Sequence, residues 1–115
     1  MSLYLGAMEQ ARLKDPRGLI WRLDVPRSVG ERMRGLLGRN ELPAFTGMLL
    51  LNCHSIHTVR MRFALDVVFL DRELRVVDVR VAEPGRWWVR CAGTKHILEA
   101  PAGSGLRPGD VLERL

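Results

Sequence analysis

The stretch that decides the fold reads LDVVFL at residues 65–70 and RVVDVRV at residues 75–81, joined by DREL at residues 71–74. Both arms are rich in β-branched residues, and in the second arm Val77, Val79 and Val81 alternate with polar residues. This pattern is typical of β-strands, and the short link between the arms predicts an antiparallel hairpin. The alternation also predicts that the three valines share one buried face and that the other face of this arm is solvated.

Further short strands are predicted at near-regular intervals along the chain, at residues 19–25, 48–51, 87–91, 95–100 and 111–115. Ser28 and Glu31 match a capping box, in which each side chain accepts a hydrogen bond from the backbone amide of the other residue. They predict a short helix near residues 28–38, ended by Gly38, with its arginines, Arg32 among them, pointing into solvent. Many short strands and one helix predict a mainly β domain, α+β only at the margin, as an antiparallel β-sandwich or barrel-like fold.

Length and composition limit the class of protein. The 115 residues, 47% of them hydrophobic and 27% charged, fit one soluble globular domain and exclude a disordered, collagen-like or disulfide-scaffold protein. No apolar run approaches the roughly 20 residues that span a bilayer. Residues 1–18 show no clear periodicity and predict a loose N-terminal arm, so that residues 19–115 form a single β-rich domain. The N-terminal residues do not resemble a signal peptide, which favours a cytoplasmic location over export.

The positive charge is concentrated in the first half of the chain but is spread along it. Residues 1–62 hold 10 basic and 5 acidic residues, against 8 and 8 in residues 63–115, for a net charge of +5. No basic run is present, and aromatic residues make up only 6% of the chain. We therefore expect solvated arginines, and keep nucleic-acid or anion binding through the Arg-rich N-terminal half as a minor alternative. The sequence names no partner and is compatible with a monomer or a weak homodimer.

The densest group of chemically active residues is CHSIHT at residues 53–58. Cys53, His54 and His57 are possible metal ligands, but no second Cys/His pair accompanies them. We therefore predict no metal site and no cofactor. Whether Cys53 pairs with Cys91 stays open, because sequence does not place their Cα atoms.

Two carboxylates interrupt predicted strands that are otherwise apolar. Asp66 and Glu99 each lie among apolar residues, where an unpaired charge would cost several kcal/mol. They either act with His57 as general acid and base, or hold loops in place by accepting hydrogen bonds from backbone amides. We favour the structural interpretation, and expect Asp66 to be buried and bound by donors such as Thr58.

The other candidate residues lie around this segment or in turns. Arg60 and Arg62 are two residues apart and form either an anion-binding fork or a solvated strand edge. The candidate pocket therefore comprises His57, Thr58, Asp66, Glu99, Arg60 and Arg62, and the residues assigned structural roles are Ser28, Glu31, Asp66, Gly109 and Asp110. Strand alternation across Trp87 and Trp88 predicts one core indole and one exposed indole.

Several segments together resemble domain-of-unknown-function family 192, a family of small bacterial and archaeal proteins. They are GLLGR at residues 35–39, GMLL at 47–50, IHTVRMRFALDVVFLD at 56–71, ILEAPAG at 97–103 and PGD at 108–110. The resemblance implies a mainly β, sandwich or barrel-like fold with a small helix and no established activity. Many relatives look exported and carry Trp where His57 falls, which argues against a metal ligand there. The family hairpin usually has Gly where this chain has Leu74; since Leu disfavours positive φ, a different or longer turn is predicted.

The sequence therefore predicts a protein of unknown biochemical function, most simply a small binding or accessory module. The alternative from another class is a small hydrolase or metal-dependent enzyme that uses His57, Asp66 and Glu99. The two hypotheses are separated by whether these three side chains converge in one pocket or are satisfied separately.

Overall fold

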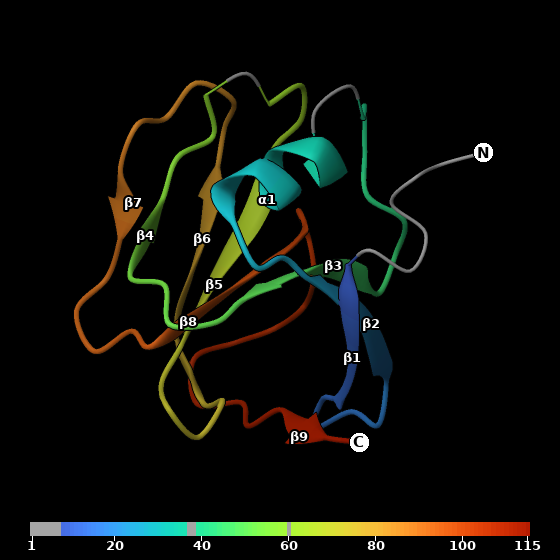
Figure 1. Cartoon of the computed structure of the whole chain (residues 1–115). Coiled ribbons are helices and arrows are strands. Elements are labelled where there is room, and N and C mark those ends of the chain that lie inside the picture. The colour runs from blue at the N-terminus through green and yellow to red at the C-terminus, as the bar shows by residue number, and fades with distance from the viewer. Residues whose placement is uncertain (1–7, 37–38, 60) are drawn as a thin grey trace.

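The computed structural model describes residues 8–36, 39–59 and 61–115. Its elements are, in chain order, β1 (Glu9–Lys14), β2 (Ile20–Val25), α1 (Val29–Leu36), β3 (Thr46–Leu50), β4 (Ser55–Ile56), β5 (Leu65–Leu70), β6 (Val76–Ala82), β7 (Val89–Arg90), β8 (His96–Pro101) and β9 (Glu113–Arg114). Seven strands form a curled sheet in the order β6-β5-β8-β3-β2-β1-β9, and β4 pairs with β7 in a second, two-stranded sheet (Figure 1). The prediction of a mainly β, barrel-like fold with one short helix is confirmed.

The C-terminal segment connects the two edges of the curled sheet. Strand β9 pairs with β1 at one edge. The residues just before β9 bind the start of β6 at the other edge: Val76 donates to the Asp110 carbonyl at 2.7 Å, and the Gly109 amide donates to the Val76 carbonyl at 2.8 Å. Gly109 has a φ of +92°, and the Asp110 carboxylate accepts a bond from the Arg107 amide at 2.9 Å. These contacts give Gly109 and Asp110 a structural place in the fold.

Two expectations about the strands are wrong. Strand β1 lies within the predicted loose arm of residues 1–18 and pairs with β2 along its whole length; residues 1–7 lie outside the described part. The buried Leu13 side chain anchors this strand in the core. The sheet is also not purely antiparallel, because β2 and β3 are parallel. Helix α1 lies between them in the chain, and such a crossover is what parallel neighbours require.

The sheet is covered on both faces, which explains why all six residues of β5 are buried. Val68 and Leu70 belong to the interior cluster, whereas Val67 and Phe69 belong to an outer cluster with Ile56 of the small β4–β7 sheet. A third cluster packs Leu36 of α1 against residues of β3 and β5. The region between the curled sheet, α1 and the small sheet is therefore the place where side chains from different layers meet.

Strand β6 departs from the predicted alternation. The β5–β6 register shifts between Phe69 and Leu70, where one extra residue enters β6. Such a bulge reverses the face of the residues beyond it, and Val77 packs on the outer cluster whereas Val79 packs on the interior one. Val81 is 59% exposed and lies near the end of β6, which is an edge strand.

Two local expectations also need correction. Ser28 Oγ accepts a bond from the Glu31 amide at 3.1 Å as predicted, but the Glu31 carboxylate accepts from the Arg27 amide rather than from Ser28. The predicted helix end at Gly38 lies outside the described residues. Leu74 does adopt positive φ, at 64°. Its amide donates to the Asp71 carbonyl, its carbonyl accepts from Leu112, and its side chain packs on the interior cluster, so tertiary contacts hold the disfavoured conformation.

Candidate functional site

A buried ion pair joins α1 to the curled sheet. Arg32 is 5% exposed and Glu99 of β8 is fully buried. The pair is bidentate, with Arg32 Nε donating to Glu99 Oε1 at 2.8 Å and Nη2 donating to Oε2 at 2.6 Å. Burial alone lowers the pKa of Arg32, but hydrogen bonding and attraction to Glu99 outweigh it and raise that pKa. The expectation that Arg32 points into solvent is wrong, because Glu99 needs a buried cation.

The same guanidinium also holds the segment that follows β4. Arg32 Nη2 donates to the His57 carbonyl at 2.8 Å. The His57 ring lies beside Trp87, with ring centroids 6.0 Å apart, and its buried Nδ1 has no partner within the described part of the chain. The backbone of His57 is thus linked to Glu99 through Arg32.

Thr58 organises the turn before β7. Its Oγ1 donates to the Glu83 carbonyl at 2.7 Å and accepts from the Arg86 amide at 2.9 Å. Its own amide donates to the Arg86 carbonyl at 2.7 Å. Thr58 therefore serves this turn and is not the donor that we expected for Asp66.

Asp66 lies on the opposite face of the sheet from Glu99. It is aligned with Ala100, an interior residue, whereas Glu99 is aligned with Val67 of the outer cluster. Aligned residues of antiparallel strands share a face, so Asp66 points into the interior. It is 5% exposed, and its Oδ2 accepts a bond from the Ser104 amide at 2.9 Å. His57, Asp66 and Glu99 therefore do not converge, and the structure assembles no acid–base site from them.

We expect Asp66→Ala to lower the free energy of unfolding by about 1–3 kcal/mol, because it leaves the buried Ser104 amide without an acceptor. Asp78→Ala, at a half-exposed carboxylate of β6, is the matched control and should change the urea midpoint little. Equal midpoints for Asp66→Ala and the wild type would contradict a structural role for Asp66.

The arginines do not form the expected anion sites. Arg62 is exposed and Arg60 lies outside the described residues, so the predicted fork has no described geometry. In the N-terminal half, Arg17 pairs with Asp15, Arg27 with Glu9, and Arg32 with Glu99. These pairs neutralise part of the basic excess that favoured the minor alternative.

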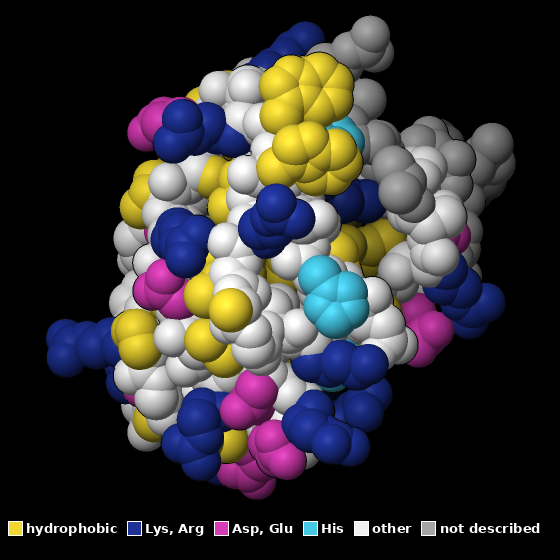
Figure 2. Space-filling view, turned by 90° about the vertical axis from the view of Figure 1, so that its left-hand side faces the viewer, with side chains coloured by type: hydrophobic (Ala, Val, Ile, Leu, Met, Phe, Trp, Pro, Cys, Tyr) yellow, Lys and Arg dark blue, Asp and Glu magenta, His cyan; other side chains and the backbone are white. Residues whose placement is uncertain are grey.

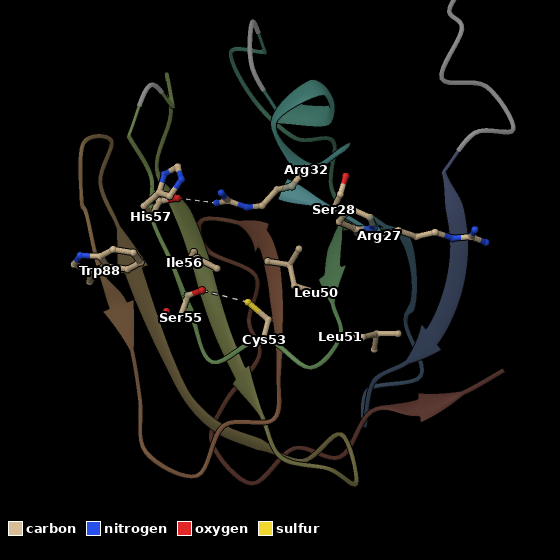
Figure 3. A pocket seen from close by; sticks show the side chains of 11 residues that line it. Arg27, Ser28, Arg32, Leu50, Leu51, Cys53, Ser55, Ile56, His57 and Trp88 are labelled. Atoms are coloured by element: carbon tan, nitrogen blue, oxygen red, sulfur yellow. Dashed lines mark hydrogen bonds between the residues drawn. The ribbon is translucent and has the colours of Figure 1, made fainter. Parts of the chain in front are cut away.

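Beside the Arg32–Glu99 pair lies a cavity of about 410 Å³, which we call the apolar pocket. Figure 3 shows α1 above it and the β3–β4 segment below, with Trp88 on one side and Arg27 and Ser28 on the other. Its lining residues are Pro26, Arg27, Ser28, Arg32, Leu50, Leu51, Cys53, Ser55, Ile56, His57 and Trp88. Of the predicted pocket residues that the structure describes, His57 alone lines it.

Cys53 belongs to the apolar part of this lining. Burial is the main effect on the Cys53 thiol and, together with the negative charge of Glu99, raises its pKa against the opposing effects of the Ser55 hydrogen bond and of Arg32. The neutral thiol donates to the Ser55 carbonyl at 3.2 Å. Cys53 and Cys91 are both free cysteines. In residues 8–36, 39–59 and 61–115, no three His, Cys, Asp or Glu side chains gather in a metal-binding group.

Both tryptophans of the pair Trp87–Trp88 are exposed, by 63% and 71%. The prediction of one core indole is wrong, because the pair precedes β7 (Val89–Arg90) instead of lying within a strand. Strand alternation therefore does not apply to these residues.

Sequence reasoning missed a second buried polar cluster, centred on Asp15 in the β1–β2 turn. Asp15 is 3% exposed and accepts hydrogen bonds from the Arg17 and Leu19 amides and from Trp21 Nε1, at 2.9, 3.1 and 3.0 Å. Arg17 Nη2 adds an ion pair at 2.7 Å. Burial by itself raises the pKa of Asp15, but these hydrogen bonds together outweigh it and lower that pKa. The signal available in the sequence was the Asp-Pro-Arg-Gly turn at residues 15–18.

Two curated relatives share much of the sequence. A UPF0127 protein of Thermococcus sibiricus is 34% identical over 94 residues, which cover 76% of this chain and 60% of that protein. A UPF0127 protein of Pyrococcus horikoshii is 32% identical over 96 residues, which cover 79% of this chain and 84% of the relative. This chain thus matches less than two thirds of the length of the Thermococcus protein.

Solved structures share the fold. A protein of unknown function from Novosphingobium aromaticivorans superposes with a TM-score of 0.75 at 25% identity, covering 92% of this chain and 84% of that one. A protein from Sinorhizobium meliloti superposes with a TM-score of 0.73 at 20% identity, a likeness of fold alone. The profile of the DUF192 family, described as "Uncharacterized ACR", matches residues 9–113. The chain therefore belongs to the DUF192 family.

Proposed function

We propose that this protein is a binding module for a small amphipathic anion, with the apolar body of the ligand in the apolar pocket and its acidic group at the rim. The observation that carries the proposal is the cavity of about 410 Å³ between α1, the β3–β4 segment and Trp88. Small-molecule sites are typically concavities of roughly 300–1,000 Å³ with apolar walls and a few polar groups.

The walls supply the driving force for the apolar body. Leu50 and Ile56 form a buried floor, at 7% and 4% exposure, while Leu51 and Trp88 at the rim are 42% and 71% exposed. A ligand that covers the two rim residues removes apolar surface from water, at roughly 25 cal/mol for each Å². The neutral Cys53 thiol leaves no competing charge on this side of the pocket.

Arg27 supplies the positive charge at the rim. Its guanidinium pairs with Glu9 at 3.1 Å, and both side chains are largely exposed, at 74% and 56%. Figure 3 shows the Arg27 side chain extended away from the pocket. Exposed pairs contribute only about 0–1 kcal/mol, so exchanging Glu9 for a ligand carboxylate costs little. The Ser28 hydroxyl, which accepts from the Glu31 amide, retains its proton for donation to the same anion.

Arg32 has a different part in the proposal. Its bidentate bond to Glu99 and its bond to the His57 carbonyl fix the position of α1 relative to the segment after β4. These are two of the elements that border the pocket, so the ion pair sets the shape of the cavity and Arg27 carries the charge for the ligand.

No helix in the described ranges has the length and hydrophobicity needed to cross a bilayer. We place the protein in the cytoplasm as part of this proposal. Two free thiols, Cys53 and Cys91, support a reducing compartment.

The test is an amide NMR titration with sodium octanoate and, separately, with 1-octanol. Octanoate should give saturable shifts at Ser28, Leu51 and Ile56. Arg27→Ala should weaken octanoate binding by about fivefold to tenfold, through the loss of a charge-assisted hydrogen bond, and leave octanol binding unchanged. Arg72→Ala, in the β5–β6 turn, is the matched control. Shifts confined to other surfaces, or equal octanoate affinity with and without the Arg27 guanidinium, would refute the proposal.

A further inference from the structure

We propose that a second surface binds single-stranded nucleic acid: the Trp–Arg surface, formed by Trp87 and Trp88 with Arg80, Arg86 and Arg90. These five residues, with Val81, Ala82 and Val89, line a concavity of about 410 Å³. This surface comes from β6, β7 and the turn between them, and not from the Arg-rich N-terminal half. Among the described lining residues, Trp88 alone is shared with the apolar pocket.

The two indoles form the stacking part of the surface. At 63% and 71% exposure, Trp87 and Trp88 each leave most of a large ring system open to solvent. Figure 2 shows a hydrophobic patch at one end of the face that carries β4 and β7, with Lys and Arg side chains around it. Every base has a π-face, and stacking of a base on an aromatic side chain contributes without regard to sequence.

The backbone under the indoles is firmly held. Buried Thr58 binds the turn at both ends. Its hydroxyl donates to the Glu83 carbonyl and accepts from the Arg86 amide, and its own amide donates to the Arg86 carbonyl. Trp87 also has the His57 ring at 6.0 Å. The indoles are therefore presented on a prepared scaffold, which reduces the ordering cost of binding.

The charges of the surface favour an anion. Arg80 is anchored by Asp78 at 3.1 Å and donates to the Arg90 carbonyl at 2.7 Å. The guanidinium groups of Arg86 and Arg90 make no hydrogen bond or ion pair with the described residues. Residues 80–90 contain one carboxylate, Glu83, which is exposed and forms no ion pair with the described residues. Two uncompensated guanidinium groups beside two indoles match the phosphates and bases of one strand.

Three other anionic partners match this surface less well than a single strand does. A bilayer surface does not fill a cavity of this size, whereas an unstacked base enters it. An acidic protein segment would satisfy the arginines but has no base to stack on each indole. Duplex DNA exposes base edges in its grooves but keeps the faces of its bases stacked, so an indole has no base face to stack on.

The test measures fluorescence anisotropy of a labelled 15-nucleotide oligo-dT over a salt series. We expect saturable binding that Trp87→Ala weakens about tenfold and Trp87→Phe largely restores, as expected for stacking. The double variant Arg86→Ala with Arg90→Ala should reduce the slope of log K against log salt by about 1.4, or 0.7 for each phosphate contact. Arg72→Ala should leave both quantities unchanged.

Trp87 does not line the apolar pocket, so Trp87→Ala should keep its octanoate affinity, and the failure of one proposal is distinguishable from that of the other. No binding of oligo-dT at low salt would overturn the inference. So would equal affinity for Trp87→Ala and wild type, since that result removes stacking. Equal or tighter binding of poly-glutamate, of duplex DNA or of phosphatidylserine vesicles, weakened by the same substitutions, would assign the surface to that partner instead.

Discussion

Glu99→Ala is expected to lower the free energy of unfolding by about 3–5 kcal/mol. The substitution leaves the Arg32 guanidinium buried at 5% exposure without its carboxylate. A buried cation keeps its desolvation cost after it loses its partner. Urea unfolding followed by circular dichroism measures the loss directly.

Two controls separate the lost partner from lost packing. Replacing both members, Arg32→Leu with Glu99→Leu, should recover most of the stability, because neither side of the contact then carries an unpaired charge. Glu113→Ala removes an exposed carboxylate, 65% accessible and 3.8 Å from Lys14, and should cause no measurable change. A double variant as unstable as Glu99→Ala would show that the pair itself, and not the stranded charge, holds α1 in place.

Asp15→Ala should cost about 2–4 kcal/mol, because it strands several donors around one buried carboxylate. These donors are the Arg17 and Leu19 amides and the Trp21 indole, and the Arg17 guanidinium loses its ion pair as well. Asp24→Ala, at a half-exposed carboxylate of β2 that accepts a bond from Gln10, is the control and should cost far less.

The pH dependence of stability in a second variant, Asp15→Asn, gives an independent test. The pKa of Asp15 is lowered in the folded protein, because its hydrogen bonds outweigh burial. A lowered folded pKa means that the stabilisation is complete above the unfolded value of about 3.9 and is lost as pH falls through the folded pKa. The difference in stability between wild type and Asp15→Asn should therefore be constant from pH 5 to 7 and shrink below about pH 4. A difference that grows on acidification would contradict this account.

Elements with a strong local pattern could be predicted from the sequence. The hairpin of β5 and β6 follows from its β-branched residues, and α1 begins after Ser28 as the cap predicts. The bulge at Val77 and the positive φ of Leu74 could not, since contacts with distant residues decide both. For Leu74, the partner is Leu112 in the C-terminal segment.

The candidate site was harder to predict, because its residues come from three layers. The sequence placed Glu99 among apolar residues, and a carboxylate buried there needs a cation or hydrogen-bond donors. Arg32 lies three residues after Val29 and four before Leu36, on the side of α1 that faces the sheet, so its position on the helix was a usable signal. The partnership still needed the tertiary structure, since 67 residues separate Arg32 from Glu99. The exposure of both Trp87 and Trp88 depended on where β7 begins, which the sequence pattern does not define.

The segment around Gly109, Asp110 and β9 links the two edges of the curled sheet, because its few residues bind β6 on one side and β1 on the other. The two strands that it joins belong to opposite halves of the chain, so its contacts require both halves to be in place. Contacts of high sequence separation slow folding. When this segment is not bound to the sheet, the ends of β1 and β6 are both free to pair with another chain. The docked C-terminal segment therefore protects the protein against association through these strand edges.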